Sequence, residues 1–396
     1  MRLRTARGKP ALLCYCANVH PGETLDDVRA ALRRYARPIR ERLGVRQLGV
    51  GLWVSRGALD QLHREGQAGI ARLRDGLAED GLFVFTMNGF PYGNFQADVV
   101  KRDVYHPDWS TRQRQRYLLE LAETLAALLP DDISDGTIST LPIAHREEAG
   151  RDIWPLALEQ ICELTEDLGR LRQQTGKSIR VCFEPEPGCL LETTADAVKM
   201  FQDRLPEIAA RRNLAPELID RHLGVCFDTC HQAVAFEDAA GSLAMLRAAG
   251  ITVGKVQLAS ALIVREPDSP AGRAALTRFD EPRFLHQVRA QLDDGALAAV
   301  DDLPAALAVP RPIPADRPWR VHFHVPIHRD LVGELGTTRS FLRDTLSTVA
   351  DWEVLPHLEV ETYTWSVLPP GERPVDDDGL IAGIAEELRW VSKEIT

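Results

Sequence analysis

Two side chains that can bind a divalent metal follow a short apolar run near the middle of the chain. The run Leu223-Gly-Val-Cys-Phe leads directly into Asp228, and His231 follows three residues later. This pattern is typical of a buried parallel strand whose carboxyl end carries polar groups. A carboxylate supplies an oxygen ligand and an imidazole a nitrogen ligand. Taken alone, the pair fits a helix-capping aspartate beside a half-buried histidine equally well.

Polar side chains end other strand-like runs as well. They are Asn18 or His20, Asn88, His145, Glu184 with Glu186, Gln257, His322 with His324, and Glu361. Several acids buried in one place repel each other unless a cation neutralises them. Carboxylates at the ends of three late strands therefore favour a metal site.

Two of these strand-end residues, and two polar residues within the same strands, also fit structural roles. His322 fits a core histidine bonded to a backbone carbonyl, and Glu359 fits a structural or outward-facing carboxylate. Gln257 fits an orienting amide, because amides are weak ligands for transition metals. Lys255 fits either an ion-pair partner or a binder of phosphate or carboxylate.

Short apolar runs alternate with longer amphipathic ones along most of the chain, and this alternation indicates the fold. Strand-like runs cover residues 11–18, 48–54, 82–88, 137–143, 178–183, 223–228, 253–258, 319–325 and 357–363. Helical periodicity fills most of the intervals between them. The pattern predicts an α/β protein with a closed, eight-stranded TIM barrel. An open doubly wound sheet is the alternative, but no GxGxxG or GxxxxGK[ST] turn follows any of the runs.

The alternation breaks between the seventh and the last barrel strand. Residues 284–298 predict a hairpin around Asp293-Asp-Gly295, and residues 304–316 are Pro-rich and loop-like. We assign run 319–325 to an excursion between strands seven and eight that reaches back over the barrel mouth, with an insertion at about 264–318. Because no composition break marks a second domain, we expect one domain over residues 1–396.

Composition narrows the class of partner. The chain of 396 residues has a formal net charge of -11, which disfavours nucleic acid and anionic membranes as partners. No run of 18 apolar residues predicts a membrane span, and the apolar part of the N-terminus is too short for a signal peptide. Seven cysteines without a CxxC pair favour reduced thiols in a cytoplasmic protein. A small-molecule metabolite is the expected partner.

Longer motifs resemble a known superfamily. FEPEPG (183–188), GVCFDTCH (224–231) and LEVET (358–362) resemble strand-end motifs of the xylose isomerase-like barrels, which include sugar isomerases, ketose 3-epimerases and apurinic-site endonucleases. Within that superfamily the whole chain is similar to the family of bacterial metabolite traffic proteins called EboE. The residues that carry this similarity include NVHPGET (18–24), FTMNGFPYG (85–93), STLPIAHR (139–146), KVQLASAL (255–262), VHFHVPIH (321–328) and HLEVETYTW (357–365).

The resemblance implies a divalent metal, Mn, Mg, Co or Zn, and a set of site residues. The implied ligands are Glu184, Asp228, Gln257, His324 and Glu361, with Glu184 and Glu361 also acting as catalytic base and acid. The expected substrate-binding residues are His231, Asn88, His145, Lys255 and Trp365. Gln257 stands where a histidine ligand is usual, and Asn88 where the endonucleases have a histidine. These departures imply a single oxygen-rich metal site, or no metal, rather than a three-zinc cluster.

Three functions follow from these expectations. The first is metal-assisted isomerisation or epimerisation of a small hydroxy-carbonyl or sugar-like metabolite in an Ebo-type traffic pathway, with contact to other proteins of that pathway. The second is a non-catalytic metabolite-binding or carrier protein on the same barrel, which the replacement of a ligand by Gln257 favours. The third, an apurinic-site nuclease, fits the acidic balance least.

Overall fold

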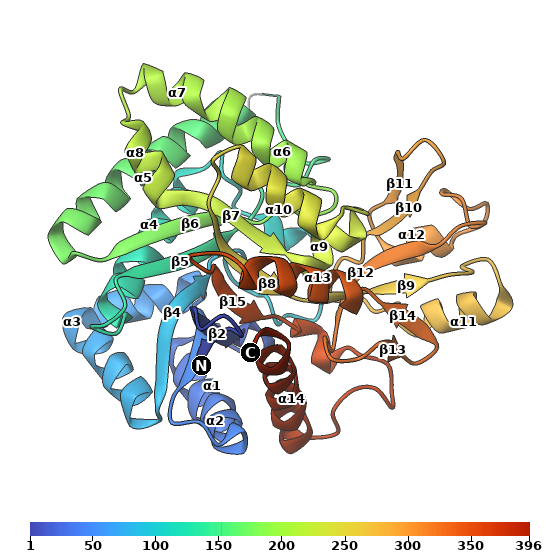
Figure 1. Ribbon diagram of the computed structural model, residues 1–396, viewed down its shortest axis with the longest axis horizontal. Helices are drawn as coiled ribbons and strands as arrows, with labels where there is room; N and C mark the ends of the chain where they lie inside the picture. The colour runs from blue at the N-terminus through green and yellow to red at the C-terminus, as the bar shows by residue number, and fades with distance from the viewer. Residues whose placement is uncertain (152) are drawn as a thin grey trace.

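The computed structural model describes residues 1–151 and 153–396, and within them eight parallel strands close into a barrel (Figure 1). Neighbouring strands pair in chain order, and the first pairs with both the second and the eighth, which closes the cylinder. The predicted TIM barrel is confirmed. Its strands are β2 (Pro10–Cys16), β3 (Leu48–Trp53), β4 (Leu82–Asn88), β5 (Asp135–Thr140), β6 (Ser178–Phe183), β7 (Leu223–Asp228), β8 (Val253–Leu258) and β15 (His357–Val360).

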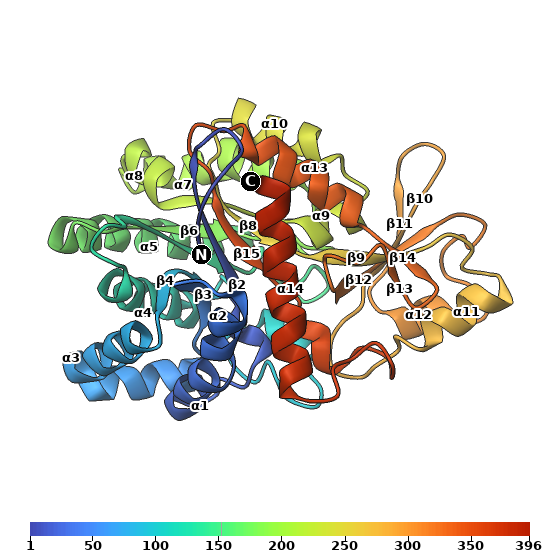
Figure 2. The same ribbon diagram turned by 60° about the horizontal axis from the view of Figure 1, so that its bottom comes forward.

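Helices surround the barrel and connect its strands (Figures 1 and 2). Capping residues mark several of their starts: Thr24 and Asp27 form a reciprocal capping box at α1, and Ser55 caps α3. The main helices are α1 (Leu25–Ala31), α2 (Arg37–Leu43), α3 (Arg56–Glu79), α4 (Arg112–Leu128), α5 (Ile153–Thr175), α6 (Thr194–Lys199), α7 (Leu205–Arg211), α8 (Pro216–His222), α9 (Thr229–Val234), α10 (Ala239–Ala248), α13 (Arg339–Ala350) and α14 (Asp377–Ile395). As far as the structure describes the chain, no helix combines the length and apolarity that a membrane crossing needs.

A second, antiparallel sheet lies between β8 and β15 in sequence and beside the barrel in space (Figure 1). This confirms the predicted excursion between barrel strands seven and eight. Its strand order is β11-β10-β12-β9-β14-β13, and β10 and β11 form the hairpin predicted around residues 293–295. The elements are β9 (Ser260–Val264), α11 (Pro270–Thr277), β10 (Val288–Gln291), β11 (Leu297–Val300), α12 (Leu303–Leu307), β12 (Trp319–Val325), β13 (Leu331–Val332) and β14 (Leu335–Thr337).

Some boundaries differ from those predicted. Strand β5 ends at Thr140, because Pro142 has no N–H to pair and Ile143 adopts a left-handed backbone with φ of 74°. The short helix α12 lies at the start of the segment predicted to be a loop. Four short strands were not predicted from the sequence: β1 (Arg2–Arg4), which pairs antiparallel with β2, and β9, β13 and β14. These four strands have two to five residues each, and runs this short carry little periodicity.

Candidate metal centre

Three buried carboxylates meet at the carboxyl ends of β6, β7 and β15. Glu184, Asp228 and Glu361 each offer an oxygen that lies within 4.8 Å of the other two. Gln257, at the end of β8, pairs in register with Asp228 on one side and with Glu359 on the other. The barrel therefore gathers four of the predicted ligand positions from four neighbouring strands.

The local bonds of these acids leave some oxygens free. Asp228 Oδ1 accepts the backbone N–H groups of Cys230 and His231 at 2.7 and 2.9 Å and so caps α9. Its Oδ2, Glu184 Oε2 and both polar atoms of Gln257 have no hydrogen-bond partner among the described residues. The capping role and a ligand role for Asp228 are thus compatible, because they use different oxygens.

Glu361 is held by two amide side chains. Asn18 and Asn88 donate to its Oε1 at 2.8 and 2.9 Å, and all three residues are buried. Asn88 is the last residue of β4, and Asn18 lies in the short helical turn after β2. The two bonds leave Oε2 of Glu361 available to a ligand.

Three histidines each have their Nδ1 atom hydrogen-bonded to an oxygen. The Nδ1 atoms of His231, His322 and His324 lie 3.1, 2.6 and 2.6 Å from the oxygens of Pro185, the Gln287 side chain and Glu361. Because those oxygens can only accept, each Nδ1 carries the proton and each Nε2 presents a lone pair. This is the arrangement of metal-binding histidines, whose other nitrogen is bonded to an oxygen outside the coordination sphere. His322 finds the side-chain oxygen of Gln287 rather than a backbone carbonyl.

The histidines and acids form overlapping groups that can each hold a cation. Asp228, His231 and His324 make one such group, and Glu186, His231 and His322 make another. Buried oxygen and nitrogen atoms that converge without partners fit a divalent metal, because the cation offsets the cost of burying them. The mixed nitrogen and oxygen donors are compatible with Zn, Mn or Co, whereas the all-carboxylate group also suits Mg.

Burial sets the charge of the metal-free centre. It raises the pKa of Glu361 to about 8, with the charge on Asp228 contributing, and it raises the pKa of Glu184 well above its usual range, with Glu361 contributing. Burial lowers the pKa of His231 to about 3 and of His324 to about 4. Near neutral pH the imidazoles of His231 and His324 are therefore neutral, which is the form that binds metal, while Glu361 holds a proton that a cation would displace.

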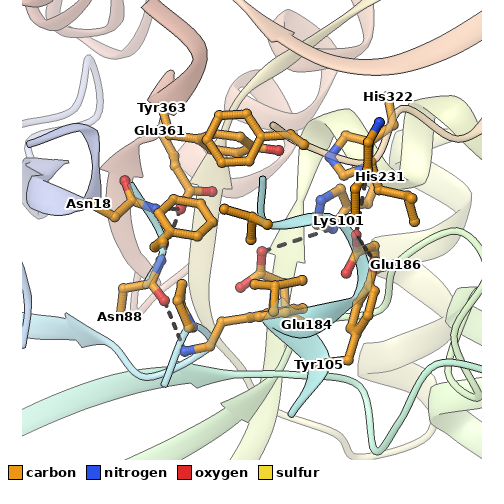
Figure 3. Close-up of a pocket in the computed structure, with 17 residues that line it drawn as sticks. Asn18, Asn88, Lys101, Tyr105, Glu184, Glu186, His231, His322, Glu361 and Tyr363 are labelled. Carbon is orange, nitrogen blue, oxygen red and sulfur yellow. Dashed lines mark hydrogen bonds and ion pairs between the residues drawn. The ribbon is translucent and has the colours of Figure 1, made fainter. Parts of the chain in front are cut away.

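The centre faces a cavity of about 50 Å³, enough for a few water molecules (Figure 3). Its apolar side comes from residues 90–105, in the irregular segment after β4, and from the excursion. The backbone N–H groups of Val100 and Lys101 donate to Arg283 O at 2.8 and 2.9 Å, and Lys101 Nζ lies 2.7 Å from Asp302. The lining residues are Asn18, Asn88, Phe90, Pro91, Phe95, Val100, Lys101, Val104, Tyr105, Glu184, Glu186, His231, Phe284, Leu285, His322, Glu361 and Tyr363.

Tyr105 and Gln287 join the site without having been predicted. Both donate to Glu186 Oε1, Tyr105 at 2.8 Å and Gln287 at 3.2 Å. Gln287 lies just before β10, in a hairpin whose sequence carries no chemical motif. Only its position in space reveals it.

Asn88 and His231, both expected to bind substrate, line the cavity. The other three residues with that expected role, His145, Lys255 and Trp365, are not among the residues that line it. Lys255 is buried inside the barrel, with Nζ 2.8 Å from Glu359 Oε1 and 3.1 Å from Ser139 Oγ. His145 packs beside Tyr105, with ring centroids 5.1 Å apart. Trp365 packs against Gly383 of α14 instead of facing the cavity. A Cβ added to Gly383 would lie 2.6 Å from the indole ring of Trp365.

Comparisons with known proteins place the chain among remote structural neighbours. No protein-family model matches it, and no curated protein matches it. It is similar to the IolI protein with a bound zinc atom, at 14% identity and a TM-score of 0.46 over 97% of this chain and 99% of that one. It is also similar to a D-tagatose 3-epimerase-like protein (14%, TM-score 0.39, 62% and 75% of the two chains) and to a family 2 AP endonuclease from Brucella melitensis (15%, TM-score 0.37, 69% and 91%). Sequence identities and TM-scores this low do not allow the activity or ligand of these proteins to be assigned to this chain.

Proposed function

We propose that this protein is a metal-dependent isomerase or epimerase of a small hydroxy-carbonyl or sugar-like metabolite. The observation that carries the proposal is the convergence of carboxylate oxygens from Glu184, Asp228 and Glu361 beside neutral histidines at one cavity. Such a donor set can hold a cation and two oxygens of a substrate at the same place.

In the proposed reaction, different residues of the centre would bind the metal, transfer protons and orient the Glu361 carboxyl group. A divalent ion held by Glu184, Asp228, His324 and Glu361, with Gln257 adjacent, would polarise substrate oxygens as a Lewis acid. Glu184 and Glu361 come from different sides of the barrel mouth, so one can remove a proton from a substrate carbon and the other can return one. Asn18 and Asn88 fix the orientation of the Glu361 carboxyl group.

The surroundings of the acids support proton transfer. A carboxyl pKa near neutrality, as at Glu361, suits a group that must both take and give a proton. His231, with its Nε2 directed to the acids, can orient a substrate oxygen. Phe90, Phe95 and Tyr363 line the cavity and exclude bulk water.

The motif similarity to the EboE family supports a finer proposal. We propose that the chain acts in an Ebo-type metabolite traffic pathway, in the cytoplasm, and meets other proteins of that pathway. The similarity extends over motifs from residue 18 to residue 365 and includes segments outside the metal centre.

A non-catalytic metabolite carrier is the second candidate. The observation that favours it is Gln257, an amide in the place of a stronger ligand. A carrier would bind a metabolite in the same cavity and release it unchanged. Nuclease action on apurinic DNA has less support, because the strand-end acids and the net charge of -11 repel a phosphate backbone.

The first experiment is elemental analysis of protein purified without chelator. We expect about one metal per chain in the wild type and loss of that metal in Asp228→Ala and Glu361→Ala. Glu79→Ala, which removes an exposed carboxylate of α3, is the control and should keep the metal. Absence of metal, even after incubation with Mn, Co or Zn, would exclude the metal-assisted mechanism and direct attention to co-purifying ligands.

The proton-transfer roles need a separate test. We expect Glu184→Gln and Glu361→Gln to fold and to lose isomerisation of hydroxy-carbonyl substrates, with circular dichroism as the check on folding. Unchanged turnover in either variant would remove that residue from the proposed acid and base pair. Binding of substrate without turnover by the wild type would support the carrier.

A further inference from the structure

The segments that carry His324 and Glu361 belong to different sheets but are bonded to each other. His324 lies on β12 of the second sheet, whereas Glu361 follows β15 of the barrel. His324 Nδ1 donates to the backbone oxygen of Glu361 at 2.6 Å, and the Thr364 hydroxyl donates back to the oxygen of His324. The excursion therefore delivers a ligand to the barrel through this contact.

A buried carboxylate on the last helix joins both segments. Glu387 of α14 is 1% exposed, and its Oε1 accepts the Thr362 hydroxyl at 2.6 Å and the Ile327 N–H at 3.2 Å. Thr362 directly follows Glu361, and Ile327 lies three residues beyond His324. One oxygen atom of Glu387 thus accepts hydrogen bonds from both of the segments that carry these two proposed metal ligands.

A second contact of α14 supports the same segment. Gly383, one helical turn before Glu387, receives the indole of Trp365, and a side chain there would collide with the ring. Helix α14 runs along the barrel on the side of the second sheet (Figure 2). Two successive turns of α14 therefore contact residues 361–366, one through Gly383 and the next through Glu387.

We propose that Glu387 is a positioning residue of the metal centre, which holds Glu361 and His324 in a single arrangement. The inference rests on the proposed metal function, but it concerns a residue that does not line the cavity. Groups that orient metal ligands from outside the coordination sphere change metal affinity about 10- to 100-fold when they are replaced.

Co²⁺ titration of purified protein tests this role through both affinity and visible absorption. We expect Glu387→Leu to weaken Co²⁺ binding about 10- to 100-fold and to alter the absorption of the bound ion. Glu387→Gln keeps the accepting oxygen and should restore both. Glu120→Leu is the matched control, because Glu120 is a buried carboxylate of α4 that pairs with Arg56 and Arg116, so its loss should lower stability without changing Co²⁺ binding.

Hydrogen exchange separates this inference from the metal function. Faster exchange of residues 322–328 and 361–366 in Glu387→Leu, but not in Glu120→Leu, would support the positioning role even if the wild type binds no Co²⁺. Wild-type Co²⁺ affinity, absorption and exchange in Glu387→Leu would overturn it. If Glu387→Leu does not fold, Thr362→Val removes one of the two bonds and carries the same comparisons.

Discussion

Replacing Glu361 by Gln should stabilise the metal-free protein at neutral and alkaline pH. Burial raises the pKa of Glu361 from 4.5 to about 8, with the charges on Asp228 and Glu359 contributing. Between these two values the folded state keeps the proton and the unfolded state has lost it. The free energy of unfolding of the wild type therefore falls as the pH rises through this interval.

The size of the effect follows from the shift. Each unit of pKa corresponds to about 1.4 kcal/mol, so a rise from 4.5 to about 8 destabilises the fold by roughly 5 kcal/mol once Glu361 is ionised. That is a large part of the 5–15 kcal/mol typical of a folded protein. Gln cannot ionise, yet its side-chain oxygen can still accept from Asn18 and Asn88. The variant should match the wild type near pH 4.5 and exceed it by several kcal/mol near pH 8.

Urea unfolding in EDTA, at pH values from about 5 to 8, measures this difference. Because Glu184 and Asp228 titrate in both proteins, the comparison rests on the gap between variant and wild type at each pH. Glu79→Gln should show no gap, and added Zn²⁺ or Mn²⁺ should stabilise the wild type more than Glu361→Gln. A gap that stays constant with pH, or that closes as the pH rises, would refute the electrostatic reasoning.

Three further substitutions test the support of the site. Gly51→Ala should destabilise by at least about 1–3 kcal/mol in urea unfolding, because its Cβ would lie 1.4 Å from Glu359 Oε2, and an unchanged midpoint would contradict this packing. Lys255→Met should cost about 3–5 kcal/mol by leaving Glu359 buried and unpaired, and Lys255→Met with Glu359→Gln should recover part of the loss. Asn88→Ala should lower Co²⁺ affinity about 10- to 100-fold with little change in melting temperature, and unaltered affinity would show that Asn18 suffices.

The alternation of strands and helices determined the barrel, because each barrel strand is a local apolar run that must be covered on both faces. The same local reasoning located the strand-end acids. Glu184 directly follows the last residue of β6, and Asp228 is itself the last residue of β7. Parallel strands in a barrel bring their carboxyl ends together at one mouth. Nothing beyond residue type and position was needed to group them with Glu361.

Which side chains actually face the cavity was decided by tertiary structure. The two-residue period of a strand assigns Lys255 and Gln257 to one face, but the depth of each in the barrel depends on how neighbouring strands are staggered. Lys255 consequently pairs with Glu359 in the interior, whereas Gln257 stands beside the acids at the mouth.

The second sheet shows the same limit over a longer range. Gln287 and His324 lie far from Glu186 and Glu361 in sequence, and they reach them only because the antiparallel sheet packs beside the barrel. Trp365, which was expected to bind substrate, packs instead against Gly383 of α14. The sequence determined which groups reach the mouth of the barrel, and packing between distant segments decided which of them share one cavity, because that packing depends on contacts that no local pattern encodes.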